Sequence, residues 1–156
     1  GGRRLLAVGA VAINRGLIHP AEAYRASLGD APVDALIGLL QFIARSPVVV
    51  FNAPFNRGSL EKAFEQHLGN QPDLQWLDLM VMMPSLYPER SGGQARMDTW
   101  LAAFGIDRVD QRDALLEALA VAQLHQVALA GTRAFNLVTP KDLLDTETSR
   151  RWLRGA

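Results

Sequence analysis

Two asparagines follow the most apolar short run of the chain. Val48–Phe51 is a run of β-branched and aromatic residues, and Asn52 and Asn56 come soon after it, on either side of Pro54. Ligand sites in α/β proteins gather at the carboxyl ends of strands, where the first turn of the next helix points into the crevice. Asparagine is also a preferred helix N-cap. On spacing alone a capping role is favoured over a binding role, and both interpretations stay open.

A second group of polar residues opens the longest predicted helix, Arg112–Ala130. Glu117 shares a helical face with Val121 and Leu124, and most of the other positions are Ala, Leu or Val. A carboxylate in such apolar surroundings must be paired, must bind a metal ion or must face a cavity. The alternative is a glutamate near the start of a helix that the helix dipole or the nearby Arg112 stabilises. The sequence leaves these two interpretations equally open.

The composition excludes several classes of site. The formal net charge is zero, with 16 Lys and Arg against 16 Asp and Glu, so nothing indicates tight non-specific binding of nucleic acid. The chain has no cysteine, which rules out disulfides and thiolate metal sites and favours an intracellular, cytoplasmic protein. Its three histidines show no metal-ligand spacing, and no phosphate-binding glycine loop or Ser-His-Asp order occurs. No apolar run approaches the roughly eighteen residues of a membrane span, so we expect no membrane partner.

The elements that must position these residues follow from periodicity and turn signals. Asn14-Arg15-Gly16 is a tight-turn signal, Pro20 marks an edge or irregular stretch, and Gly131 is expected beyond the end of the longest helix. The run Val48–Phe51 suits a strand buried on both faces of a partly parallel sheet. The expected strands are Leu5–Ile13, Leu17–Leu28 and Val48–Phe51, and the expected helices are Pro32–Ala44, Arg57–Leu68, Met97–Phe104, Arg112–Ala130 and a last one from Thr139 to Trp152. This order predicts a single α/β or α+β three-layer domain over residues 1–156.

Several segments, taken in order, resemble a known family. They are Arg4–Ile13, Val50–Asn56, Trp76–Leu79, Trp100–Ile106, Arg112–Ala118, Asp142–Leu144 and Arg151–Leu153. Together they resemble the DEDD-type 3′–5′ exonucleases, the DEDDh group that includes the proofreading epsilon subunit of bacterial DNA polymerase III. The resemblance implies an RNase H-like three-layer fold, in which a mixed sheet is flanked by helices. The first, central strand of that sheet is missing from this sequence.

The resemblance also implies a chemistry and assigns residues to it. In the family, acidic residues hold two Mg²⁺ or Mn²⁺ ions that assist hydrolysis of the terminal phosphodiester, and a histidine acts as general base. The metal-site aspartate of the second motif corresponds to Asn56, the general base to Arg112, and the last aspartate to Glu117, which is the one remaining metal ligand. Asn52 and Phe55 correspond to substrate-binding positions. An amide is a poor ligand for a divalent ion, and an arginine cannot abstract a proton.

These departures predict an exonuclease-type domain with impaired catalysis. The first acidic motif, Asp-x-Glu, would lie before Gly1 and is not in the sequence, so we expect a fragment or a decayed copy. The implied ligand is the 3′ end of a single-stranded nucleic acid. An alternative is a non-catalytic domain that binds nucleic-acid ends or a protein, and a third is a structural domain without a ligand. The missing strand exposes sheet edges, which predicts a homodimer.

Overall fold

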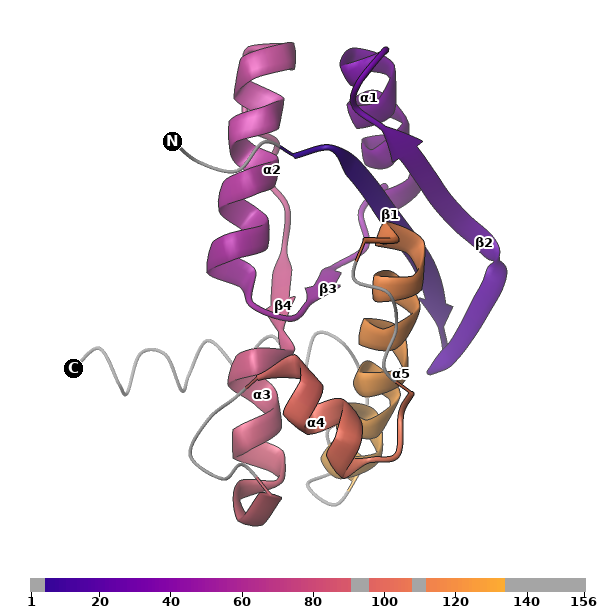
Figure 1. The fold of residues 1–156 in the computed structure, drawn as a ribbon, viewed down its shortest axis with the longest axis vertical. Helices are drawn as coiled ribbons and strands as arrows, with labels where there is room; N and C mark the ends of the chain where they lie inside the picture. Colours follow the sequence, from indigo (N-terminus) through magenta and orange to yellow (C-terminus); the bar gives the residue numbers. More distant parts are fainter. Residues whose placement is uncertain (1–4, 91–95, 108–111, 134–156) are drawn as a thin grey trace, which may run out of the picture.

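The computed structural model describes residues 5–90, 96–107 and 112–133, which form an α/β fold of short strands and helices (Figure 1). The elements along these residues are β1 Ala7–Asn14, β2 Leu17–Ser27, α1 Pro32–Ile43, β3 Val48–Val50, α2 Ala53–Leu68, β4 Trp76–Asp78, α3 Leu79–Leu86, the 3₁₀ turn η1 Pro88–Arg90, α4 Met97–Ala103 and α5 Ala114–Arg133. The helix expected from Thr139 to Trp152 lies outside the described residues.

The predicted hairpin is confirmed. Strands β1 and β2 pair antiparallel, and Arg15 and Gly16 make the connection with φ values of 54° and 76°. Positive φ at both positions of a two-residue loop matches the right-handed twist of the strands that the loop joins. The register shifts between Val11 and Ala12, which pair with Ala23 and His19 respectively. Residues 20–22 therefore bulge out of the pairing, where Pro20 predicted an irregularity.

The sheet differs from the single mixed sheet that we expected. The described strands form two separate sheets of two strands, β1 with β2 and β3 with β4. Strand β3 pairs parallel with β4, so that Val48 lies opposite Trp76 and Val50 opposite Asp78. The expectation that β3 is buried on both faces was wrong, because its three valines are only half-buried. A strand with a neighbour on one edge alone keeps part of its surface accessible.

Two helices exceed their predicted bounds. Helix α2 begins at Ala53 instead of near Arg57, since backbone N–H groups at its start find a distant acceptor, which is described below. Helix α5 runs through Gly131 to Arg133 instead of ending before the glycine. A Cβ on Gly131 would lie 2.9 Å from the Tyr87 hydroxyl oxygen, and that hydroxyl donates to the Val127 carbonyl at 2.9 Å. The glycine thus makes room for a side chain that packs against the helix.

Helix α5 connects the two sheets. It crosses in front of β1 in Figure 1 and contacts β1, β2, β3 and α3. The backbones of α5 and β1 approach so closely that a Cβ on Gly9 would lie 2.5 Å from the carbonyl carbon of Ala114. The segment Ala114–Thr132 has a mean hydropathy of 1.3 and, contrary to expectation, is long and apolar enough to cross a membrane. The core helices of soluble proteins meet the same test of length and composition, and 33% of the apolar window of α5 is buried inside the protein.

The buried apolar side chains fall into three clusters. The hairpin cluster joins the β1–β2 hairpin to α1 and α2; its members are Val8, Leu28, Ala35, Leu36, Leu39, Ala63 and Phe64. The α5 cluster consists of Leu79, Met83, Trp100, Leu124 and Ala128. A small third cluster consists of Leu77, Met82 and Leu129. Val49 and Leu86 pack against both of the latter two clusters. No described residue packs against both the hairpin cluster and one of these two clusters, although a domain of this size usually has one contiguous core.

Candidate functional site

The first predicted site lies at the start of α2. Asn52 occupies the N-cap position with φ of 73°, but its side chain makes no capping hydrogen bond, so a side-chain cap from Asn52 was a wrong expectation. The Asn56 side chain turns back on its own chain, where its amide nitrogen donates to the carbonyls of Phe51 at 2.8 Å and Asn52 at 2.9 Å. These bonds orient the Asn56 amide and leave its carbonyl oxygen as the atom able to accept from a ligand.

Asp78 performs the capping that Asn52 does not, and sequence reasoning missed it. Its carboxylate accepts the backbone N–H of Asn52 at 2.8 Å, of Ala53 at 2.8 Å and of Met80 at 3.0 Å. Asp78 is fully buried, and it is also the N-cap of α3. One carboxylate therefore satisfies donors at the starts of two helices. An aspartate directly before an apolar helix was visible in the sequence as a local cap, whereas its bonds to residues 52 and 53 depend on the pairing of β3 with β4.

Phe55 is the exposed aromatic side chain of this turn. It is 53% exposed, although it stands two residues after the fully covered Ala53, in the first turn of α2. A large apolar side chain held in water next to oriented polar groups is available for stacking on a ligand. This placement is compatible with the substrate-binding role that the resemblance assigns to it.

The second predicted site lies at the start of α5. Asp113 caps this helix by accepting the backbone N–H groups of Leu115 at 3.0 Å and Leu116 at 3.2 Å. Both of its carboxylate oxygens also accept from one guanidinium nitrogen of Arg25 on β2, at 2.8 and 2.9 Å. The backbone N–H of Leu116, with smaller contributions from Arg25 and Leu115, lowers the pKa of Asp113 below its usual value. This pair fastens the start of α5 to the hairpin.

Arg112 and Glu117 flank this cap. Arg112 precedes Asp113 and is exposed, while the backbone N–H of Glu117 donates to the Asp113 carbonyl at 3.0 Å. Glu117 is exposed, so the expectation of a carboxylate enclosed by apolar side chains was wrong, although partial desolvation still raises the pKa of its carboxyl group.

A neighbour of each predicted site packs against the α5 cluster. Phe51, which precedes Asn52, and Val121, which lies one turn after Glu117, both pack against this cluster. Within the described residues no group of three or more His, Asp or Glu side chains is placed to hold a metal ion. The Asn56 amide nitrogen donates to backbone carbonyls, and Glu117 is the single carboxylate among the residues that the resemblance assigns to the metal site. These residues therefore do not fit a two-metal centre.

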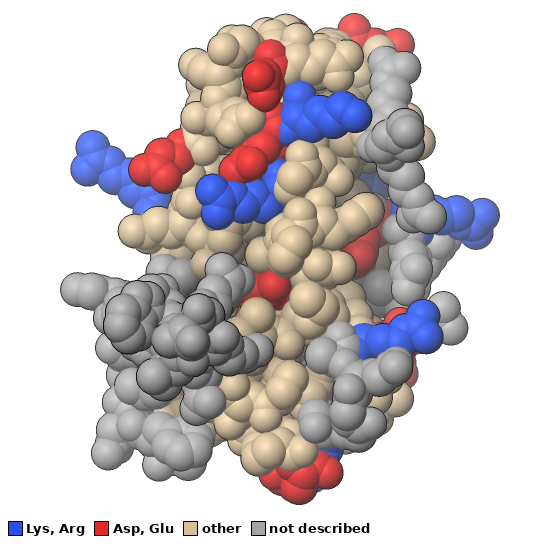
Figure 2. All heavy atoms as spheres, turned by 90° about the vertical axis from the view of Figure 1, so that its left-hand side faces the viewer, with Lys and Arg blue, Asp and Glu red and all other residues tan. Residues whose placement is uncertain are grey.

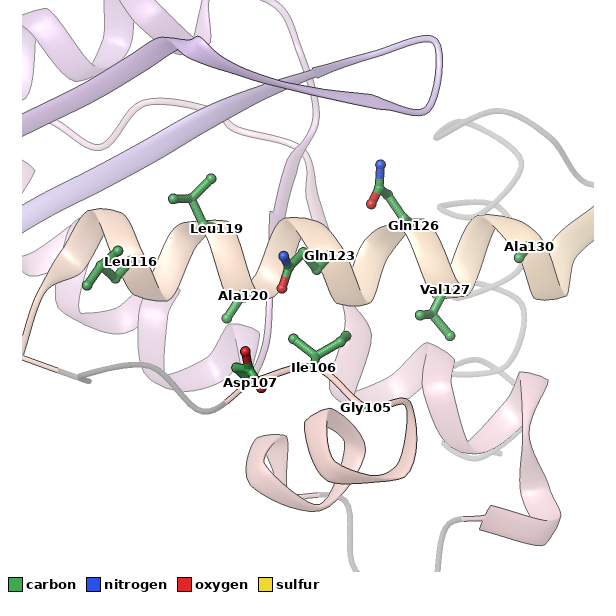
Figure 3. Close-up of a pocket in the computed structure, with 10 residues that line it drawn as sticks. All are labelled: Gly105, Ile106, Asp107, Leu116, Leu119, Ala120, Gln123, Gln126, Val127 and Ala130. Carbon is green, nitrogen blue, oxygen red and sulfur yellow. The ribbon is translucent and has the colours of Figure 1, made fainter.

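A groove runs along another face of α5. It has a volume of about 640 Å³ and lies between α5 and the segment that follows α4 (Figure 3). Figure 3 shows Leu116, Ala120, Gln123 and Val127 on the α5 side, facing Gly105–Asp107. The groove is mostly apolar, and neither Asn56 nor Glu117 lines it. It is therefore separate from the residues to which the sequence assigned chemistry.

Two buried side chains in the described part of the chain have polar atoms without a hydrogen-bond partner. They are the indole nitrogen of Trp100 and both imidazole nitrogens of His125. His125 is 2% exposed, and burial lowers the pKa of its imidazole to about 4. Sequence reasoning set His125 aside because a lone histidine carries no pattern. Its burial follows from the packing of α5 against other elements, which the sequence of one helix does not contain.

Charges on the face shown in Figure 2 are mixed. Lys and Arg side chains lie beside Asp and Glu side chains, with uncharged surface around them, as the zero net charge leads one to expect. The described part of this face has no broad basic area, so binding of a polyanion would depend on a few local contacts. Comparison with known proteins adds no assignment: no family model, curated protein or solved structure matches the chain.

Proposed function

We propose that this chain is a non-hydrolysing domain of the DEDD exonuclease type, with an RNase H-like arrangement, that holds the 3′ end of a single-stranded nucleic acid. The exposed Phe55 beside the oriented Asn56 amide is the observation that supports it most directly. Nucleic-acid bases stack on aromatic side chains whatever their sequence, which suits recognition of an end rather than of a motif.

The polar groups around Phe55 suit the sugar and phosphate of a terminal nucleotide. The carbonyl oxygen of Asn56 can accept from a terminal hydroxyl, and the exposed Arg112 guanidinium can donate to a phosphate oxygen. The resemblance assigns these positions to one site, and the packing of Phe51 and Val121 on one cluster agrees with their being neighbours. Because the described residues do not fit a two-metal centre, the proposal includes no hydrolytic step.

The proposal can be tested with 3′-labelled single-stranded DNA and RNA in the presence of Mg²⁺ or Mn²⁺. We expect binding, measured by fluorescence anisotropy, without shortening of the labelled strand. Loss of one stacked base costs about 1–3 kcal/mol, so Phe55→Ala should weaken binding by about fivefold to 150-fold. Leu17→Ala is a matched control, since Leu17 is a 62% exposed apolar residue at the far end of the hairpin turn.

The outcomes separate the alternatives. Shortening of the strand by the unmodified chain would show that the domain hydrolyses its ligand. Equal binding by the Phe55→Ala and Leu17→Ala variants would remove Phe55 from the site. A triple variant with Asn56→Asp, Arg112→His and Glu117→Asp asks whether restored side chains suffice for hydrolysis, and we expect that they do not, because the described residues supply no other metal-binding group.

A further inference from the structure

Helix α5 has an apolar face that the described elements cover only in part. Its segment Ala114–Thr132 is long and apolar, yet only 33% of this window is buried. The uncovered part faces the groove of about 640 Å³ between α5 and residues 105–107 (Figure 3). Leu116 is 39% exposed there, and Gln123 and Ala130 are also exposed. A helix with an open apolar groove along it is suited to receive a second helix.

The α5 residues that line this groove are arranged symmetrically about Gln123. They lie three, four and seven residues before and after it, so that all of them share one face of the helix. We call this set the α5 face, and it consists of Leu116, Leu119, Ala120, Gln123, Gln126, Val127 and Ala130. Two identical chains related by a twofold axis need a self-complementary surface, because each residue then contacts its counterpart's opposite number in both directions.

The sizes of the side chains on the α5 face fit such a twofold axis. If the axis passes beside Gln123 and the two helices are antiparallel, Leu116 of one copy lies opposite Ala130 of the other. Leu119 lies opposite Val127 in the same way. Each larger side chain thus faces a smaller one, which lets the two rows interdigitate at the usual helix separation of about 8–10 Å.

The polar character of the α5 face also suits a copy of itself. The face contains no charged residue and the net charge of the chain is zero, so two copies meet without repulsion between like charges. Asp107 lines the groove from the side across from α5. The Gln123 amide both donates and accepts, so two of these amides can bond each other across the axis. A single polar pair within an apolar contact fixes the register of two helices.

We propose that two copies of this chain associate through the α5 face, with antiparallel helices and a twofold axis beside Gln123. The contact extends from Leu116 to Ala130, which is about 21 Å of helix. Interfaces below roughly 1,200 Å² belong to weak, transient complexes, and one pair of helices over this length is of that kind. The dimer therefore forms at micromolar or higher concentrations. It uses a helix face instead of the sheet edges expected from the sequence, and it does not depend on the proposed binding of nucleic acid.

Sedimentation of the full chain over a hundredfold range of concentration tests the association. We expect a reversible equilibrium between monomer and dimer. Leu116→Arg should weaken it by about tenfold or more, because two unpaired charges enter the contact. Ile37→Arg is the matched control, since Ile37 is a 41% exposed apolar residue on α1. A chain that stays monomeric throughout would overturn the proposal and leave the α5 face to a different protein. Equal association by the two variants would overturn it as well.

A pair of charges tests which residues face each other. Ala130→Glu alone should weaken association as Leu116→Arg does. The double variant Leu116→Arg/Ala130→Glu should recover it, because a positive and a negative charge then meet at each end of the contact. Recovery also shows that the single variants fold. A double variant that associates no better than either single variant would overturn the antiparallel register.

The absence of cysteine from the sequence allows a direct test of the axis. Gln123→Cys should give a disulfide-linked dimer under mild oxidation, since the two copies of position 123 meet at the axis. Leu116→Cys should not, because its two copies lie about 21 Å apart. Gln41→Cys, at an exposed glutamine of α1, measures cross-linking by random collision. Efficient cross-linking by Leu116→Cys would show parallel helices, and equal rates for Gln41→Cys and Gln123→Cys would show chance encounters; either result contradicts the proposal.

Discussion

The buried imidazole of His125 predicts a specific dependence of stability on pH. Burial lowers the pKa of this group from 6.5 to about 4, because the charged form loses its hydration and gains no partner among the described residues. In the unfolded chain the imidazole takes up a proton near pH 6.5, whereas in the folded chain it resists protonation down to about pH 4. The contribution of His125 is therefore fully present above pH 6.5 and is lost as the pH falls towards 4.

The size of the effect follows from the two pKa values. Each unit of difference corresponds to about 1.4 kcal/mol, so the interval from 6.5 to about 4 removes about 3 kcal/mol of the free energy of unfolding. For a domain of ordinary stability this is a large fraction of the total. His125→Leu replaces the imidazole by an apolar side chain that does not titrate, and it also removes the two unpartnered nitrogens. This variant should be at least as stable as the unmodified chain at pH 7 and lose about 3 kcal/mol less by pH 4.

Urea unfolding at pH 7, 6, 5 and 4 measures this difference directly. Other groups that titrate in this range, including Glu117, are common to both proteins and cancel in the comparison. His67→Leu, which removes an imidazole outside the buried core, is the control and should follow the unmodified chain. Parallel loss of stability by the unmodified chain and by His125→Leu between pH 7 and pH 4 would refute the reasoning. An NMR titration of the folded chain that finds His125 half-protonated near pH 6.5 would do so as well.

Two further predictions concern the packing that positions the candidate site. Asp78→Asn replaces a carboxylate that accepts several backbone N–H groups with an amide that can accept only some of them. It should lower the free energy of unfolding, measured with urea, by about 3 kcal/mol. The control Asp73→Asn, at an exposed loop position, should change that free energy by no more than about 0.5 kcal/mol. Gly9→Ala places a Cβ 2.5 Å from the backbone of Ala114. It should lower the free energy of unfolding by about 1–3 kcal/mol, and the thermal midpoint with it. Gly58→Ala, which meets nothing within 4 Å on α2, should raise it, and equal effects of the two alanines would contradict the close approach of α5 to β1.

Local signals in the sequence predicted the hairpin well. Arg15 and Gly16 form the expected turn, and the irregularity falls at Pro20, because a two-residue loop and a proline act on their immediate neighbours alone. Non-local interactions account for what was missed. Helix α2 starts four residues early because Asp78, from a different strand, accepts the N–H groups of Asn52 and Ala53. No periodicity within residues 48–60 contains that information.

The candidate site was predictable in part for the same reason. The sequence singled out Asn56 and Glu117, and their positions in the first turns of α2 and α5 follow from local periodicity. The direction of the Asn56 amide depends on the backbone conformation at Asn52, which is left-handed. The burial of His125 depends on the packing of α5 against other elements, which no single segment of the sequence contains.

The separate clusters of apolar side chains bear on how the protein unfolds. The hairpin with α1 and α2 buries one set of side chains, and the parallel strands with α3, α4 and α5 bury the others. Two such units unfold together only if they share contacts that are lost when either unit unfolds. Helix α5 supplies them through its contacts with β1, the Arg25–Asp113 pair and the bond from Gln126 to Gly16. Weakening the contacts between α5 and the hairpin should therefore turn one sharp unfolding transition into two broader ones.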